Sequence, residues 1–104
     1  MTFATDHEVE RALAALPGWR REGDALVREL EFRDFEEAMH FAERVADCAV
    51  DYGRRPDICI SALNIVRLSV ANLHHAGFTH AELRLIEKVS AVLSEHHPEA
   101  VARS

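Results

Sequence analysis

Apolar residues recur along the chain with two different periods, one typical of helices and the other of strands. Residues 9–16, 35–49 and 83–93 carry apolar side chains every three or four positions, which predicts three amphipathic helices. Between these helices lie two pairs of extended stretches, each pair joined by a short turn, which predicts two hairpins. The four expected strands are 19–22, 26–32, 58–63 and 66–71.

Local signals at the helix starts agree with this pattern. Thr5-x-x-Glu8 and Thr79-x-x-Glu82 have the form of capping boxes, and Asp34 is a capping residue before the longest helix. The resulting order is α-β-β-α-β-β-α. This order predicts an α+β fold with a four-stranded antiparallel sheet and the helices on one face.

Composition limits the classes of protein to consider. A chain of 104 residues with 48% hydrophobic content predicts a single domain over residues 1–104. A net charge of -6 argues against nucleic acid or an anionic membrane as a general partner. The chain has no apolar run of about 18 residues, so we expect no membrane span and a cytoplasmic location. Cys48 and Cys59 lack CxxC spacing and are expected to be packing residues.

The most informative stretch is the end of the longest helix. Gly53 can adopt the left-handed conformation that ends a helix, and Pro56 prevents its continuation. This exit places Arg54 and Arg55 at one turn, followed by Asp57. The arginines either form ion pairs with nearby carboxylates or bind an anionic small molecule, and both alternatives stay open.

Several segments together carry a resemblance to a known family. They are Leu16-Pro-Gly-Trp19, Phe32-Arg-Asp-Phe35, Pro56-Asp57 and Gly77-Phe-Thr79. In this order and spacing the chain resembles the pterin-4a-carbinolamine dehydratase family, whose members remove water from a hydroxytetrahydropterin. The resemblance implies the same α+β fold, lyase ancestry and assembly into homodimers or homotetramers. It implies a small-molecule ligand, which is pterin-like or, in a changed pocket, anionic.

The catalytic motif of that family is not intact in this chain. The family helix exit has the form Glu-x-x-x-His-His-Pro, and a third histidine follows the last strand. Alignment on Pro56 puts Val50 at the glutamate and arginine at both histidines of the motif, with Leu73 at the third histidine. Arginine cannot act as a general base, so the standard mechanism is not expected. Asp51 could substitute for the glutamate only if the helix end were rotated.

Histidines elsewhere are the remaining candidates for proton chemistry. His74 and His75 occupy a loop beside the position of the third family histidine, so they are candidate catalytic residues, with solvated loop histidines as the alternative. Consecutive histidines seldom ligate one ion, so we expect no metal. We also expect no cofactor. The segment His96-His97-Pro98 follows the last helix and is expected to be a frayed polar terminus.

Two functional classes follow from the sequence. The first is an enzyme with a remodelled pocket, in which Asp51, His74 and His75 are candidate catalytic residues. The ligand-binding residues would then lie in the turn, at Arg54, Arg55, Pro56 and Asp57. The second class is a non-catalytic dimeric binding or protein-assembly module that keeps the dehydratase fold.

Overall fold

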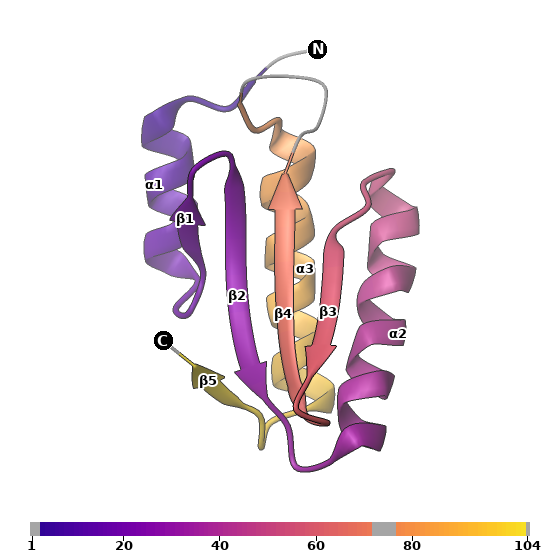
Figure 1. Ribbon diagram of the computed structural model, residues 1–104. Coiled ribbons are helices and arrows are strands. Elements are labelled where there is room, and N and C mark those ends of the chain that lie inside the picture. The colour runs from indigo at the N-terminus through magenta and orange to yellow at the C-terminus, as the bar shows by residue number, and fades with distance from the viewer. Residues whose placement is uncertain (1–2, 72–76, 104) are drawn as a thin grey trace.

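A computed structural model describes residues 3–71 and 77–103 of the chain. The described part contains three helices and five strands (Figure 1). Their bounds are α1 Asp6–Ala15, β1 Arg20–Glu22, β2 Ala25–Glu31, α2 Phe35–Tyr52, β3 Asp57–Ser61, β4 Ile65–Ala71, α3 His80–His96 and β5 Val101–Arg103. No helix in these residues is long and apolar enough to cross a bilayer.

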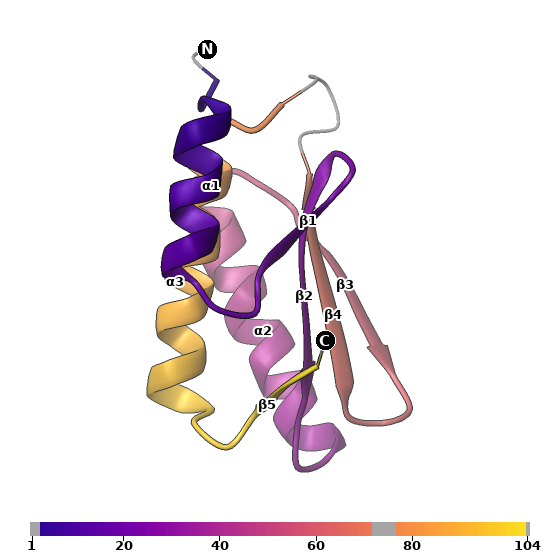
Figure 2. The ribbon, with the colours of Figure 1, turned by 90° about the vertical axis from the view of Figure 1, so that its left-hand side faces the viewer.

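The strands form one antiparallel sheet in the order β1-β2-β4-β3, and all three helices lie on one of its faces (Figure 2). Strand β2 pairs with β4 along its whole length, from Ala25 opposite Ala71 to Glu31 opposite Ile65. The predicted α+β class and the one-sided helical layer are confirmed, with β5 as an additional strand.

The core lies between the sheet and the helices, as the alternation of apolar residues along the strands predicts. Leu26 and Leu30 of β2 and Leu68 of β4 point to the helices, and each is fully buried. Phe41 of α2 and Ile86 of α3 fill the space above them and are also fully buried. Because α2 and α3 pack side by side on the same sheet, the end of α2 is held close to the start of α3.

The chain end after α3 differs from the prediction of a frayed terminus. His97 is buried, its Nδ1 lies 3.0 Å from a carboxylate oxygen of Glu37, and its ring stands edge-on to Phe32 and Phe41. The chain then turns, and β5 pairs with β2 at Glu29–Glu31. The prediction for His96-His97-Pro98 was therefore wrong, because a large imidazole next to two aromatic rings supplies core volume that the helix pattern did not reveal.

The two cysteines also differ from each other. Cys48 is buried in the core, as expected, and burial raises the pKa of its thiol. Cys59 is exposed, so the prediction of a packing role was wrong for this residue. It lies on edge strand β3 between Ile58 and Ile60, and the strand alternation turns it away from the helices.

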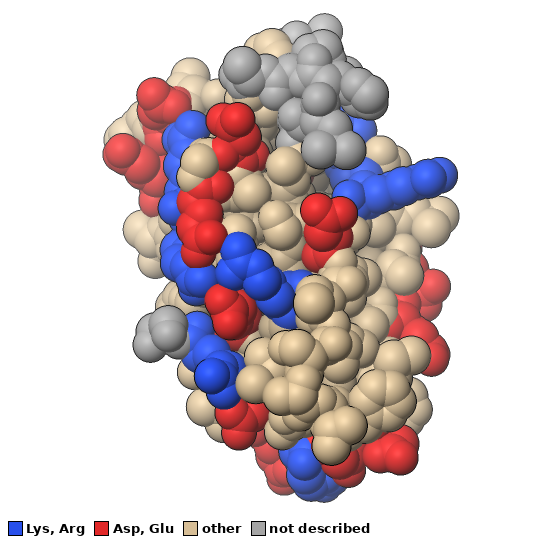
Figure 3. All heavy atoms as spheres, viewed as in Figure 1, with Lys and Arg blue, Asp and Glu red and all other residues tan. Residues whose placement is uncertain are grey.

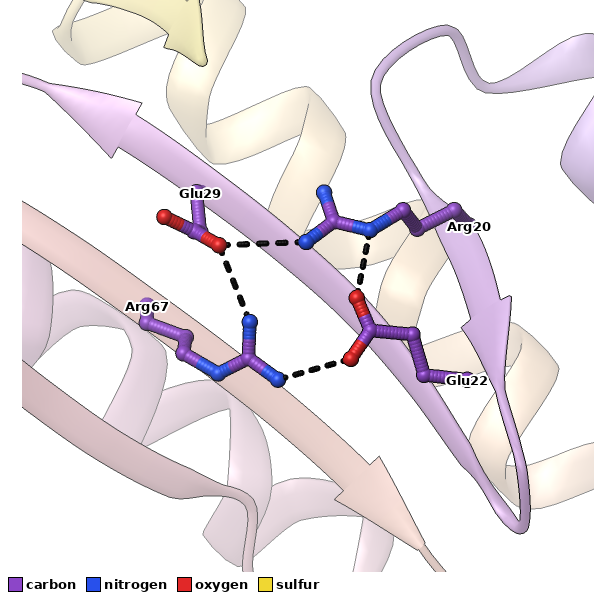
Figure 4. A network of polar contacts seen from close by, with 4 residues as sticks. All are labelled: Arg20, Glu22, Glu29 and Arg67. Atoms are coloured by element: carbon purple, nitrogen blue, oxygen red, sulfur yellow. Dashed lines mark hydrogen bonds and ion pairs between the residues drawn. The ribbon is translucent and has the colours of Figure 1, made fainter. Parts of the chain in front are cut away.

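The open face of the sheet is covered in part by paired charges (Figure 3). Arg20, Glu22, Glu29 and Arg67 form a closed ring of contacts across β1, β2 and β4 (Figure 4). Each carboxylate accepts from both arginines, at 2.6–3.1 Å, and these hydrogen bonds hold the pKa of Glu22 and of Glu29 below their ordinary values. The charges of this ring therefore compensate one another.

Candidate functional site

A pocket of about 500 Å³ opens beside the end of α2, and we call it the α2–β3 pocket. Its volume falls within the range of small-molecule sites, about 300 to 1,000 Å³. The lining residues come from the last two turns of α2, the turn that follows and the start of β3. They are Ala46, Ala49, Val50, Gly53, Arg54, Arg55, Pro56 and Ile58.

The turn that closes this pocket is set by the end of α2. Gly53 has a φ of 65°, the left-handed conformation that glycine adopts without a steric penalty. Its N–H donates to the carbonyl oxygens of Ala49 and Val50, and the N–H of Arg54 donates to Ala49 O at 3.1 Å. Pro56 cannot continue a helix, so the chain enters β3 at Asp57. The turn predicted from the sequence is confirmed.

Arg54 lines the pocket but is held by groups at the start of α3. Its Nε donates to Oε2 of Glu82 at 2.9 Å, and one terminal nitrogen donates to Oγ1 of Thr79 at 3.3 Å. The other terminal nitrogen donates to the carbonyl oxygen of Gly53 at 3.1 Å. For Arg54, the ion-pair alternative holds, and the pair is partly buried rather than a surface contact.

Glu82 is the buried partner in this arrangement, since its side chain is 0% exposed. Burial by itself raises the pKa of a carboxyl group, but hydrogen bonds from Thr79 and Arg54 outweigh it and lower the pKa of Glu82 below its ordinary value. The backbone N–H of Thr79 donates to Oε1, and the Thr79 hydroxyl and Arg54 both contact Oε2. Glu82 is therefore a charged group inside the protein.

Arg55 lies in the same turn but has different surroundings. Arg55 is exposed and is one of the residues that line the pocket, and no carboxylate in the described part of the chain forms an ion pair with it. The rest of the lining is mostly apolar, with Ala46, Pro56 and Ile58 around Val50, which is 79% exposed. The pocket therefore offers apolar surface with an available cation at its edge.

The family comparison agrees with this fold. The sequence profile described as "Pterin 4 alpha carbinolamine dehydratase" matches residues 2–92. The chain belongs to this family.

Individual relatives agree with the match. A "Putative pterin-4-alpha-carbinolamine dehydratase" of Koribacter versatilis is 40% identical over 94 residues, covering 90% of this chain and 95% of its own. A relative of the same name from Thermomicrobium roseum is 38% identical, covering 90% of this chain and 100% of its own.

Two solved structures extend the comparison to the fold. A transcriptional coactivator/pterin dehydratase from Brucella Melitensis superposes with a TM-score of 0.78 at 28% identity, covering 88% of this chain and 98% of its own. A pterin dehydratase-like protein identified as a RuBisCO assembly factor in the alpha-carboxysome gives a TM-score of 0.56 at 16% identity, covering 71% and 84%. The second likeness concerns the fold alone.

The structure brings together some of the residues that the sequence suggested for this dehydratase-family site. Arg54, Arg55 and Pro56 line one pocket. Asp51 is exposed near the end of α2, and Asp57 is exposed as the first residue of β3, and neither is among the lining residues. Helix α2 runs to Tyr52 and ends at Gly53, and the catalytic role of Asp51 stays a prediction.

The two candidate histidines cannot be placed in the same way. His74 and His75, together with Leu73, lie outside the described residues, so their catalytic role stays a prediction. Among the residues that the structure does describe, no cluster of histidine, cysteine and carboxylate side chains is arranged to hold a metal ion.

Sequence reasoning missed the buried ion pair of Glu82 with Arg54. The sequence indicated this residue only as the last position of the Thr79-x-x-Glu82 capping box, which the structure contains. A glutamate is almost never fully buried unless it is paired. The available signal was the arginine pair at the preceding helix exit, because helices adjacent on one sheet face can bring such charges together.

The buried pair predicts a pH-dependent contribution to stability. The folded-state pKa of Glu82 lies below the ordinary value of 4.5, so the contribution is fully present above that pH and is lost as the pH falls through the folded-state value. Glu82→Gln should lower the free energy of unfolding at pH 7 by about 2 kcal/mol, as for hydrogen bonds to charged groups. Urea unfolding followed by circular dichroism at pH 7, 4 and 3 measures this difference.

The matched control is Glu87→Gln, which removes an exposed carboxylate from the same helix. The control should differ little from the parent at any of these pH values. The interpretation fails if Glu82→Gln matches the parent at pH 7, or if its deficit is the same at all three pH values.

Proposed function

We propose that this protein is a pterin dehydratase-like, lyase-type protein whose remodelled α2–β3 pocket binds a small anionic molecule. The single observation that supports this proposal most is the presence of Arg54 and Arg55 in the lining of a pocket with a mostly apolar surface. A permanent planar cation suits a carboxylate or phosphate group better than a neutral pterin edge. The proposal includes weak or lost activity on 4a-hydroxytetrahydropterin.

The chemistry of the described lining supports the second part of the proposal. Dehydration of a carbinolamine needs one group that protonates the departing oxygen and another that accepts a proton from the ring nitrogen. The lining contains two arginines, which stay protonated, and otherwise alanine, valine, glycine, proline and isoleucine. Any general acid or base must therefore come from outside this lining, and His74 and His75 remain the proposed candidates.

A pocket-filling substitution tests the location of the ligand. Ala46→Phe places a ring in the α2–β3 pocket, so it should weaken binding of benzoate or phenyl phosphate by roughly 10-fold or more, through loss of apolar contact area. The measurement is an NMR titration that follows the methyl groups of Val50 and Ile58. Ala14→Phe on the exposed side of α1 adds the same ring away from the pocket and should leave binding unchanged.

Two results would contradict this placement. One is that neither anion perturbs the Val50 and Ile58 methyl groups of the parent at millimolar concentration. The other is that Ala46→Phe binds both anions as tightly as the Ala14→Phe control.

Turnover measurements test the loss of the family reaction. Loss of a positioned acid or base commonly lowers the rate by about 10² to 10⁴-fold, so the parent should be far slower than a relative with the complete Glu-x-x-x-His-His-Pro motif. The fourfold variant Val50→Glu, Arg54→His, Arg55→His, Leu73→His should raise the rate.

The activity measurement needs a folding control, because Arg54→His also removes the guanidinium that pairs with Glu82. Circular dichroism of each variant supplies this control. Parent turnover equal to that of the motif-complete relative would contradict the proposal.

A second candidate function is a non-catalytic assembly module, and one observation favours it. Helix α2 carries an exposed apolar shoulder, formed by Phe35, Met39, Ala46 and Val50, beside its buried face. Phe35 is 47% exposed and Met39 is 37% exposed, although both are large apolar side chains. Such a continuous stripe is typical of a surface that contacts another protein. The names of the two structural neighbours include a coactivator and an assembly factor.

The same shoulder supports the proposal that the protein forms homodimers or homotetramers. Strand β3 is also an edge strand, and no other strand of the described chain covers its outer side. Light scattering at micromolar concentration should give a mass above 11.7 kDa. Phe35→Glu with Met39→Glu should lower the measured mass, because charges placed in an apolar contact cost desolvation energy.

Leu63→Glu is the matched control, since Leu63 is an exposed apolar residue on the turn between β3 and β4. It should keep the mass of the parent. A parent particle of 11.7 kDa would exclude self-association, and an unchanged mass in the double variant would exclude the α2 shoulder as a contact.

A further inference from the structure

The two neighbouring arginines of the turn have different surroundings, and this difference separates their roles. All three guanidinium nitrogens of Arg54 have a partner within the protein: Glu82, Thr79 and the carbonyl of Gly53. Arg55 is exposed and has no ion-pair partner among the described residues. Without a ligand, the charge of Arg54 is therefore compensated by a carboxylate, whereas that of Arg55 is not.

We propose that Arg55 recognises the anionic group of the ligand, and that Glu82 is a positioning residue that makes Arg54 a structural part of the turn. This inference rests on the proposed function of the α2–β3 pocket and assigns its specificity to one side chain. The ligand class that fits is a monoanion with an apolar ring, such as an aromatic carboxylate.

Charge is the first argument for this assignment. The Glu82 carboxylate lies 2.9 Å from Nε of Arg54 and is fully buried. Hydrogen bonds keep it ionised, as the lowered pKa indicates. An anion brought to Arg54 would meet a guanidinium whose charge is already compensated, and it would approach a second carboxylate in a poorly solvated place. An anion at Arg55 meets a cation without that opposing charge.

Geometry is the second argument. Glu82 holds Arg54 from the first turn of α3, and Thr79 at the cap of the same helix adds a second contact. Arg54 in turn follows directly on Gly53 at the end of α2. The contacts therefore fix the chain between the two helices at the residue before Arg55. Because one residue then separates Arg55 from the start of β3, its backbone position is set from both sides.

The lining sets the class of ligand. Ala46, Val50, Pro56 and Ile58 present apolar atoms to the pocket, and they can contact a ring. With Arg54 compensated, one unpaired cation remains in the described lining. A single carboxylate on a flat apolar ring matches one guanidinium and this surface, because a planar carboxylate accepts two parallel hydrogen bonds from an arginine. A dianion would leave part of its charge without a partner.

The test compares benzoate with its neutral analogue benzamide in one pocket. The parent should bind benzoate more tightly than benzamide by roughly 10- to 100-fold, the range for a charge-assisted hydrogen bond. Arg55→Ala should bring this ratio close to one. Arg54→Ala and Glu82→Gln should weaken both ligands by a similar factor and keep the ratio, because their effect is on the turn. Arg55→Lys should retain part of the ratio.

A second measurement uses the parent protein alone, so its result does not depend on whether the variants fold. In the parent, the Nε–H resonance of Arg55 should shift on addition of benzoate, whereas that of Arg54 should stay in place. Circular dichroism checks the fold of each variant.

The outcomes separate the two proposals. If the parent binds neither compound in the pocket, the proposed function fails. If the parent binds both equally, or if Arg54→Ala abolishes the ratio, or if the Arg54 resonance follows the titration, the assignment to Arg55 is overturned while ligand binding in the pocket stands.

Discussion

A carboxylate without solvent contact needs hydrogen-bond donors from the protein itself, and Glu82 has three of them. The Thr79 backbone, the Thr79 hydroxyl and the Arg54 guanidinium all contact it, and they come from the start of α3 and the end of α2. The arrangement ties together two helix ends that are adjacent on the sheet. The pocket at the exit of α2 shares this connection, since Arg54, which contacts Glu82, is one of its lining residues.

The surface of helix α2 is divided between the core, an exposed apolar shoulder and the lining of the pocket. One face supplies Phe41 and Val45 to the core. The neighbouring shoulder exposes Phe35 and Met39, and its last part reaches the pocket at Val50. A ligand and a partner protein would therefore meet on the same helix. Under these two proposals, a partner bound near Val50 would contact a residue that also lines the pocket.

Sequence periodicity was sufficient for the arrangement of helices and strands, because the boundaries carry chemistry that acts locally. Gly53 and Pro56 end α2, and the capping boxes start α1 and α3. The candidate site could be predicted only in part from such local signals. Arg54 and Arg55 are identical neighbours in sequence, and what distinguishes them is a glutamate about thirty positions later. The buried His97 was missed for the same reason, since its aromatic neighbours are Phe32, in the chain between β2 and α2, and Phe41 of α2.

One edge of the sheet is built from both ends of the chain. Strand β1 pairs with β2 at Ala25–Val27, and β5 pairs with the other half at Glu29–Glu31. During synthesis, β2 is complete long before residues 101–103 leave the ribosome. Until then the backbone groups of Glu29–Glu31 on that side have no strand partner among the described strands, although β4 can already pair with the opposite side. The pairing of this half of β2 is therefore completed only after residues 101–103 have been made, and these residues come shortly after the buried His97 in the chain.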